Sequence, residues 1–173
     1  GKPADKVDEA KEKESSIDMS RVGIAGFSTS APIVAVAMGI DPRISAAAIF
    51  LGSANFHEVL AQSEEVRMKT WRERSLERSG QSREDFAAHA YSILDPINPL
   101  RHSSSIDPGR VLYFDAEFDE FVPRSVREAF WRALGKPERI TFLAKHRPSF
   151  FSLTPLDNYS SDRKIIDFFR KKL

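Results

Sequence analysis

The chain has 173 residues, of which 41% are hydrophobic, so we expect one domain with a sizeable hydrophobic core. Its 26 basic and 25 acidic residues give a formal net charge of +1, which argues against nucleic acid as a partner because no positive excess is left to bind a phosphate backbone. The absence of cysteine excludes disulfides and a cysteine nucleophile. No apolar run approaches the length of a membrane span, and the N-terminus has no apolar signal core.

Residues 1–17 are predicted to form a charged leader or linker. They are dense in lysine, aspartate and glutamate, and Val7 is the only large apolar residue before Ile17. A helix there would have no face to bury. The folded domain is therefore expected over residues 18–173.

The next stretch predicts a strand, a tight turn and a buried helix. Residues 22–25 form a short apolar run, residues 26–30 are mostly small and include Ser28, and the helix expected from Ala31 has no polar face. Such a unit is a nucleophile elbow, in which a strained turn lifts the serine Oγ above the sheet edge and requires small neighbours two positions away. The positive N-terminal end of the helix then points at the serine, where an oxyanion can be held.

A second apolar strand is predicted at residues 44–51, and a helical insertion follows at about 56–94. We expect one helix over residues 56–76 and a second that starts with a capping box at Ser82 and Asp85. Helical insertions between sheet strands commonly form a lid or cap over a site at the carboxyl ends of the strands.

The remainder of the chain alternates between strand and helix patterns. Strands are predicted at 110–115 and 139–143, with a helix at 123–135 between them and a last helix from Asp162. The last helix is expected to bury Ile165, Ile166, Phe169 and Leu173. This alternation is typical of an α/β protein with a parallel sheet.

Three motifs resemble those of an α/β-hydrolase of the esterase/lipase type. Gly26 and Ser28 match the first two positions of the family's Gly-x-Ser-x-Gly elbow, with Ser30 in place of the second glycine. Residues 119–123 match an acid loop that often reads Asp-x-x-Val-Pro, and Lys145-His146 stands where the family usually has Gly-His. The resemblance covers residues 18–173 and implies a parallel sheet with flanking helices and a helical cap insertion.

The resemblance also implies a set of functional residues. A serine nucleophile needs a histidine base, and the base needs a carboxylate to orient it. In this fold the order along the chain is serine, acid, histidine, each just beyond a strand. The matching residues are Ser28, Asp119 and His146, with the Thr29 N–H as an oxyanion donor and Phe27 as a substrate-binding residue.

Other residues remain open alternatives. Asp115 is the second choice for the acid, since it also lies at a strand end, ahead of Glu117 and Glu120. Three further histidines have no partner at metal-ligand spacing, so surface or cap-packing roles are expected for His57, His89 and His102. Five aromatic residues fit either an acyl pocket or the core: Phe56, Trp71, Phe86, Phe150 and Phe151.

Hydrolases of this type have several strands before the elbow, and one early loop supplies the second oxyanion donor. Residues 1–20 contain nothing that could form those strands, so the chain resembles the C-terminal half of such an enzyme. The elbow strand would then be an open apolar edge of the sheet. We expect a second chain, another copy in a homo-oligomer or a preceding part of a longer protein to cover that edge and complete the sheet.

The resemblance implies a serine hydrolase that cleaves a small-molecule carboxylic ester and needs no metal or organic cofactor. The missing strands, together with Ser30 and Lys145 at usual glycine positions, favour as an alternative a non-catalytic hydrolase-like binding or interaction module. A transferase or peptidase that uses the same triad is not separated from an esterase by sequence.

Overall fold

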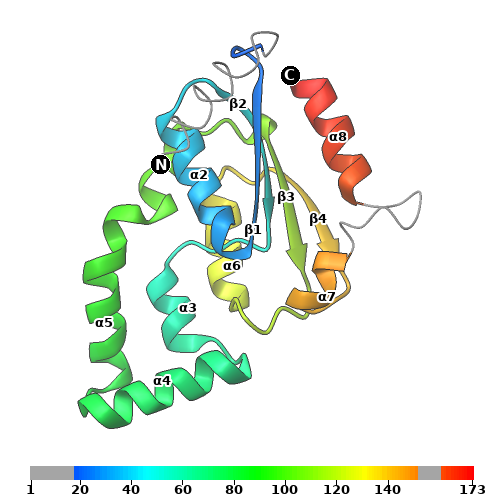
Figure 1. Ribbon diagram of the computed structural model, residues 1–173. Coiled ribbons are helices and arrows are strands. Elements are labelled where there is room, and N and C mark those ends of the chain that lie inside the picture. Colours follow the sequence, from blue (N-terminus) through cyan, green and yellow to red (C-terminus); the bar gives the residue numbers. More distant parts are fainter. Residues whose placement is uncertain (1–17, 152–160) are drawn as a thin grey trace.

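The computed structural model describes residues 18–151 and 161–173, so the predicted leader at 1–17 lies outside the described residues. The described chain forms one sheet of four parallel strands in the order β1-β2-β3-β4 (Figure 1). The strands are β1 (Val22–Phe27), β2 (Ile44–Phe50), β3 (Val111–Ala116) and β4 (Glu138–Phe142). The predicted α/β class with a parallel sheet is confirmed.

The two central strands owe their position to continuous apolar sequence. Nearly every residue of β2 and β3 is buried, as expected of parallel strands that are covered on both faces. Ile49 pairs with Tyr113, and Phe50 pairs with Phe114. The first pair packs into the core on one face, and the second pair stacks its rings at 4.0 Å on the other.

Helices cover both faces of the sheet (Figure 1). On one face, α2 (Ala31–Ile40) and α6 (Arg124–Ala133) contribute to the larger core cluster. On the other face, α8 (Ser161–Lys172) packs through Ile165, Phe168 and Phe169. Ile166, which we expected to be buried, is 47% exposed, because it lies off the apolar stripe of α8.

A helical insertion lies between β2 and β3. It contains α3 (Phe56–Gln62), α4 (Val66–Ser79) and α5 (Arg83–Leu94). Figure 1 shows these helices beyond the end of the sheet toward which the arrowheads point. Short 3-10 turns (Asp95–Ile97, Pro99–Arg101, Ser103–Ser105 and Pro108–Arg110) lead from α5 to β3.

The single helix predicted over residues 56–76 is wrong, because the chain breaks between α3 and α4. The Glu65 carboxylate accepts a hydrogen bond from the Met68 N–H at 3.0 Å and caps the start of α4. Arg72 is fully buried and donates from Nη1 to the Ser63 carbonyl at 3.0 Å, which fixes the chain after α3. The capping box predicted for α5, with Ser82 at the cap, is present.

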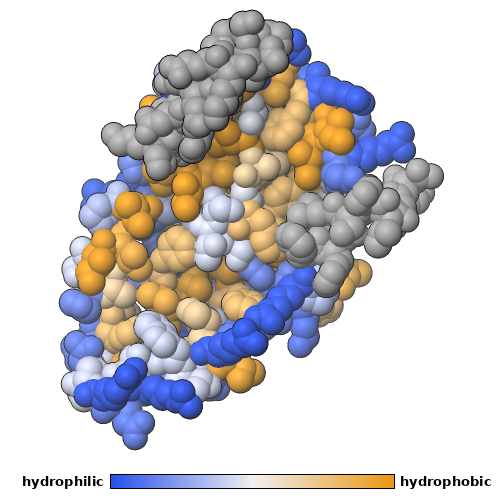
Figure 2. Space-filling model, in the orientation of Figure 1, coloured by the Kyte–Doolittle hydropathy of each residue, from blue (hydrophilic) through white to orange (hydrophobic). Residues whose placement is uncertain are grey.

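One edge of the sheet is open in the described part of the chain. There β1 pairs only with β2, and Ala25 of β1 is exposed. Ile33 and Ile40 are also exposed on α2, which packs on β1. Figure 2 shows hydrophobic surface over this face of the molecule, where β1 and α2 lie in front in Figure 1. None of the helices in residues 18–151 and 161–173 is long and apolar enough to cross a membrane.

Candidate active site

The turn after β1 holds a serine in an unusual backbone conformation. Ser28 begins the 3-10 turn η1 (Ser28–Ser30) and has φ +55°, in the left-handed region that residues with a side chain rarely adopt. The apolar helix α2 starts directly afterwards, at Ala31. The strand, the strained serine and the helix form the elbow geometry expected from the sequence.

Two small residues make this turn possible. A Cβ on Gly26 would lie 2.6 Å from Val34 Cγ2 and 2.7 Å from the Ser30 carbonyl oxygen, so only glycine fits there. Ser30, at the family's second glycine position, accepts a hydrogen bond from the Phe27 N–H at 2.8 Å and donates one to the Phe27 carbonyl at 2.8 Å. The departure from glycine therefore adds two bonds across the turn.

His146 lies between Ser28 and Asp119. It is the first residue of α7 (His146–Phe151), a short helix that the sequence pattern did not predict. Its Nε2 is 2.9 Å from Ser28 Oγ, and its Nδ1 is 2.7 Å from Asp119 Oδ2. The histidine side chain is 5% exposed and the carboxylate 0%. With the proton on Nδ1 bound to the carboxylate, Nε2 can accept the hydroxyl proton of the serine.

The Asp119 carboxylate is oriented by its own loop. Its Oδ1 accepts hydrogen bonds from the Phe121 N–H at 2.8 Å and the Val122 N–H at 3.0 Å, which leaves Oδ2 directed at the histidine. The Phe118 N–H donates to the Ala144 carbonyl at 3.1 Å and joins the acid loop to the histidine loop. Both loops thus hold their side chains through backbone bonds.

Asp115, the alternative acid, has other partners. Its carboxylate is fully buried and forms ion pairs with Arg127 at 2.6 Å and with Arg139. The guanidinium groups approach from α6 and β4, and neither could be assigned to Asp115 from the sequence. Among the carboxylates considered, Asp119 is the one whose oxygen bonds to the His146 ring.

Glu117 and Glu120 have partners other than the His146 ring. Glu117 forms a surface ion pair with Arg124 at 3.2 Å. The Glu120 carboxylate accepts a hydrogen bond from the His146 backbone N–H at 3.3 Å, so it contacts the histidine through the main chain.

Aromatic rings enclose the imidazole. The Phe27 ring lies edge-on to His146 at 5.7 Å between centroids and also contacts Phe50. The centroid of the Phe121 ring lies 4.9 Å from that of the imidazole. The Arg147 guanidinium lies over the Phe121 ring, 5.5 Å from its centroid. Phe121 was not singled out from the sequence, although its place two residues after the acid was the available signal.

Thr29 and the helical insertion lie next to the hydrogen-bonded residues Ser28, His146 and Asp119. Thr29 follows the serine in η1 and is exposed, and its part as an oxyanion donor stays a prediction. Val59 of α3 packs against Val122 and Val126, so the insertion contacts the acid loop.

The remaining histidines, together with Trp71 and Phe86, have other neighbours. The His57 ring packs edge-on against Tyr91 at 4.9 Å, His89 is exposed, and His102 lies against the backbone of Gly39. Trp71 packs on Phe86 at 5.9 Å within the insertion. The side chains of Phe150 and Phe151 lie outside the described residues, so their place in an acyl pocket stays a prediction.

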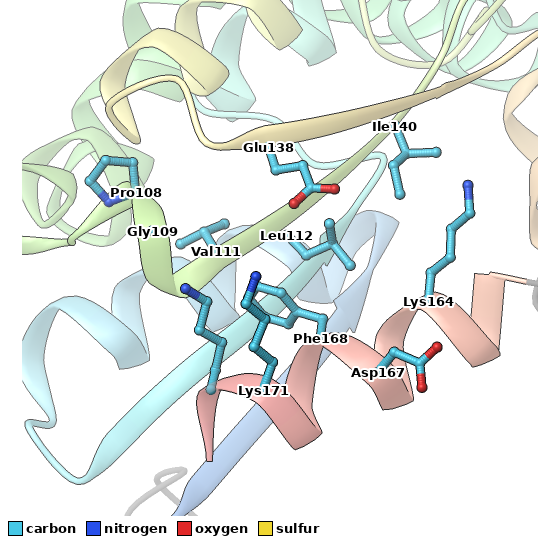
Figure 3. Close-up of a pocket in the computed structure, with 11 residues that line it drawn as sticks. Pro108, Gly109, Val111, Leu112, Glu138, Ile140, Lys164, Asp167, Phe168 and Lys171 are labelled. Carbon is cyan, nitrogen blue, oxygen red and sulfur yellow. The ribbon is translucent and has the colours of Figure 1, made fainter.

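A cavity of about 510 Å³ lies between the sheet and α8. Figure 3 shows Glu138 of β4 and Lys164 and Lys171 of α8 around it. Its lining includes Val111 and Glu138, the first residues of β3 and β4, whereas Ser28 follows the last residue of β1. The cavity is therefore at the opposite end of the parallel strands from the serine.

The sequence matches no protein-family model and no curated protein, whereas solved structures share its fold. An acylaminoacyl peptidase of Pyrococcus horikoshii superimposes with a TM-score of 0.71 at 18% identity over 96% of this chain and 26% of that chain. An esterase of Pyrococcus furiosus gives 0.60 at 13% identity over 96% of this chain and 59% of that chain. An acetyl xylan esterase from Paenibacillus sp. R4 gives 0.67 at 18% identity over 98% of this chain and 50% of that chain.

The chain has the α/β-hydrolase fold. It spans between 26% and 59% of the lengths of these three proteins. In the α/β-hydrolase fold the nucleophile, the acid and the histidine follow their strands in that order. Here Ser28 follows β1, Asp119 follows β3 and His146 follows β4.

Proposed function

We propose that the chain is the catalytic region of a serine hydrolase that cleaves a carboxylic ester. One observation carries the proposal: Ser28 Oγ, His146 and the Asp119 carboxylate form a continuous row of hydrogen bonds of 2.9 and 2.7 Å. A serine, a base and an acid that orients the base are the groups that acyl transfer requires. Support also comes from the fold, which is shared with esterases and a peptidase.

The proposed reaction begins with attack by Ser28 Oγ on the acyl carbon. His146 Nε2 takes the hydroxyl proton, and Asp119 stabilises the imidazolium that forms. The oxyanion of the tetrahedral intermediate accepts a hydrogen bond from the Thr29 N–H in the turn η1, just before α2. The imidazolium then gives its proton to the departing alcohol, and Ser28 remains acylated. Water, activated by His146, hydrolyses this acyl-enzyme.

Phe27 and the helical insertion are the parts of the chain that we expect to contact the substrate. The Phe27 ring contacts His146 and would form part of the substrate-binding surface. The insertion at 56–94 would act as a cap over the site, because its α3 packs against the acid loop through Val59. The catalytic region would then span residues 18–173.

A further part of the proposal concerns the open edge of β1. A second chain, another copy or a preceding part of a longer polypeptide would add strands there and supply the second oxyanion donor. The exposed apolar residues of α2, Ile33 and Ile40, support this because water exposure of such a face is unfavourable. Intact mass and light scattering on the native material test it, and a monomer of this chain alone with full esterase activity would contradict it.

The nucleophile is tested with a fluorophosphonate probe. The native protein should be labelled, Ser28→Ala should not, and Ser92→Ala, which removes an exposed hydroxyl on α5, should be labelled as well as the native protein. Undiminished labelling of Ser28→Ala would rule out Ser28 as the nucleophile. Turnover of p-nitrophenyl acetate should follow the labelling.

Ester and amide substrates separate the proposed esterase from a peptidase. The peptidase and the esterases share this fold, and the triad can serve either reaction. We expect p-nitrophenyl acetate to be cleaved and acetylalanine p-nitroanilide to be cleaved much more slowly. Faster cleavage of the anilide would assign the chain to peptide hydrolysis.

The alternative function is a non-catalytic hydrolase-like binding module. Ser30 and Lys145 at the family's glycine positions and the open sheet edge favour it. A folded and complete assembly that neither reacts with the probe nor hydrolyses p-nitrophenyl acetate would support the binding module and exclude the esterase.

A further inference from the structure

A buried arginine holds both ends of the loop that carries Asp119. Arg127 extends from α6, and its side chain is 4% exposed. Its Nε donates to the Val122 carbonyl at 3.1 Å, and its Nη1 donates to the Ala116 carbonyl. Ala116 is the last residue of β3, and Val122 lies three residues after the acid, so the guanidinium spans the loop.

The guanidinium is itself fixed by a buried carboxylate. Arg127 Nη1 is 2.6 Å from Asp115 Oδ1, and the other oxygen of Asp115 accepts a hydrogen bond from Arg139. Arg139 in turn donates to Glu128 at 2.6 Å. A buried charge is costly unless it is paired and hydrogen-bonded, and this network supplies the partners. The geometry uses the planar fork of arginine, which directs several donors at once.

The Arg127 guanidinium and its bonds to the Ala116 and Val122 carbonyls form a clamp on the acid loop. Val122 links this clamp to the candidate active site. Its carbonyl accepts from Arg127, while its N–H donates to Asp119 Oδ1 at 3.0 Å. The peptide groups around Val122 therefore connect the guanidinium to the carboxylate that bonds to His146. We propose that Arg127 is a positioning residue that keeps Asp119 Oδ2 directed at the His146 ring; this inference rests on the proposed hydrolase function.

The substitution Arg127→Lys tests the clamp. Lysine keeps the charge but offers a single nitrogen, which cannot reach the carbonyls of Ala116 and Val122 and the Asp115 carboxylate together. We expect the rate constant for fluorophosphonate labelling and kcat for p-nitrophenyl acetate to fall by up to roughly 100-fold. KM should be unchanged, because the hydrogen-bond partners of Arg127 are Val122, Asp115 and Ala116, none of which is proposed to bind the substrate. Arg124→Lys is the matched control on the same helix, since its side chain is 70% exposed.

A double-mutant comparison separates positioning from a general structural role. If Arg127 acts through Asp119, Arg127→Lys should slow labelling in the native background and have no further effect in Asp119→Ala. An equal loss in both backgrounds would overturn the proposal. Thermal unfolding of each variant reports whether it is folded; if Arg127→Lys is not, Asp115→Asn, which weakens the hold on the guanidinium, takes its place in the same comparison.

A second measurement keeps this inference distinct from the proposed function. If the native protein does not react with the probe, the hydrolase proposal fails, but the clamp is still read from hydrogen exchange at the Phe121 and Val122 amides, which bond to Asp119. Faster exchange there in Arg127→Lys than in Arg124→Lys supports the clamp. Equal exchange in the two variants overturns it.

Discussion

Replacement of Asp119 by asparagine should inactivate the protein while leaving its fold intact. The Oδ1 position accepts two backbone hydrogen bonds, from Phe121 and Val122, so the amide oxygen of an asparagine must occupy that position. The amide NH2 then faces His146 Nδ1, where the native carboxylate oxygen lies at 2.7 Å. A donor at that position selects the tautomer with the proton on Nε2, which cannot accept a proton from Ser28.

The expected loss follows from that change of tautomer. In a serine triad an acid-to-amide change that keeps the geometry lowers kcat about 10⁴-fold, which corresponds to about 5.4 kcal/mol in the barrier. Asp119→Asn should show this loss in p-nitrophenyl acetate hydrolysis, with an unfolding free energy close to that of the native protein. Asp107→Asn is the matched control, because Asp107 Oδ1 also accepts a backbone bond, from Gly109 at 2.9 Å, but on the exposed turn before β3. An Asp119→Asn variant that keeps more than a tenth of the native kcat would refute the reasoning.

Three further predictions concern the elbow and the ion-pair network. Gly26→Ala should lower stability by about 1–3 kcal/mol, since its Cβ would lie 2.6 Å from Val34 Cγ2, and an unchanged midpoint in urea unfolding would contradict this. Ser28→Gly should remove activity but raise the unfolding free energy by about 1 kcal/mol, because glycine adopts φ +55° without strain, and a loss of stability would count against strain at the serine. The hydrogen bond from Arg139 lowers the pKa of Glu128. The ion pair therefore stabilises the fold fully above the ordinary glutamate pKa of about 4.3, and this stabilisation is lost as the pH falls through the lowered pKa. Glu128→Gln should therefore be less stable than the native protein at pH 7, with a gap in urea unfolding that closes toward pH 3; a gap independent of pH would exclude the ion pair as its cause.

Local pattern was enough for much of the fold, and the resemblance to hydrolase motifs pointed to the three side chains that the structure joins by hydrogen bonds. The apolar runs at 44–50 and 111–116 mark buried strands because parallel strands covered on both faces have no polar side. The small residues around Ser28 indicate a strained turn, since the close contacts at Gly26 are made with neighbours in the sequence. The match of residues 119–123 to the family's acid loop favoured Asp119, the carboxylate that bonds to the His146 ring, and the loop closes two backbone bonds onto Asp119 within three residues.

Long-range contacts account for what the pattern did not contain. The guanidinium groups that occupy Asp115 come from α6 and β4, and they meet only when those elements pack on β3. The break between α3 and α4 depends on the buried Arg72, whose bonds to the turn form only when the helices fold back on each other. The aromatic ring of Phe121 contacts His146 only because the acid loop and the histidine loop pack together in the folded chain. Periodicity reports which side of an element is apolar, whereas the partners of a buried charge or ring are set by the three-dimensional packing of segments that lie far apart along the chain.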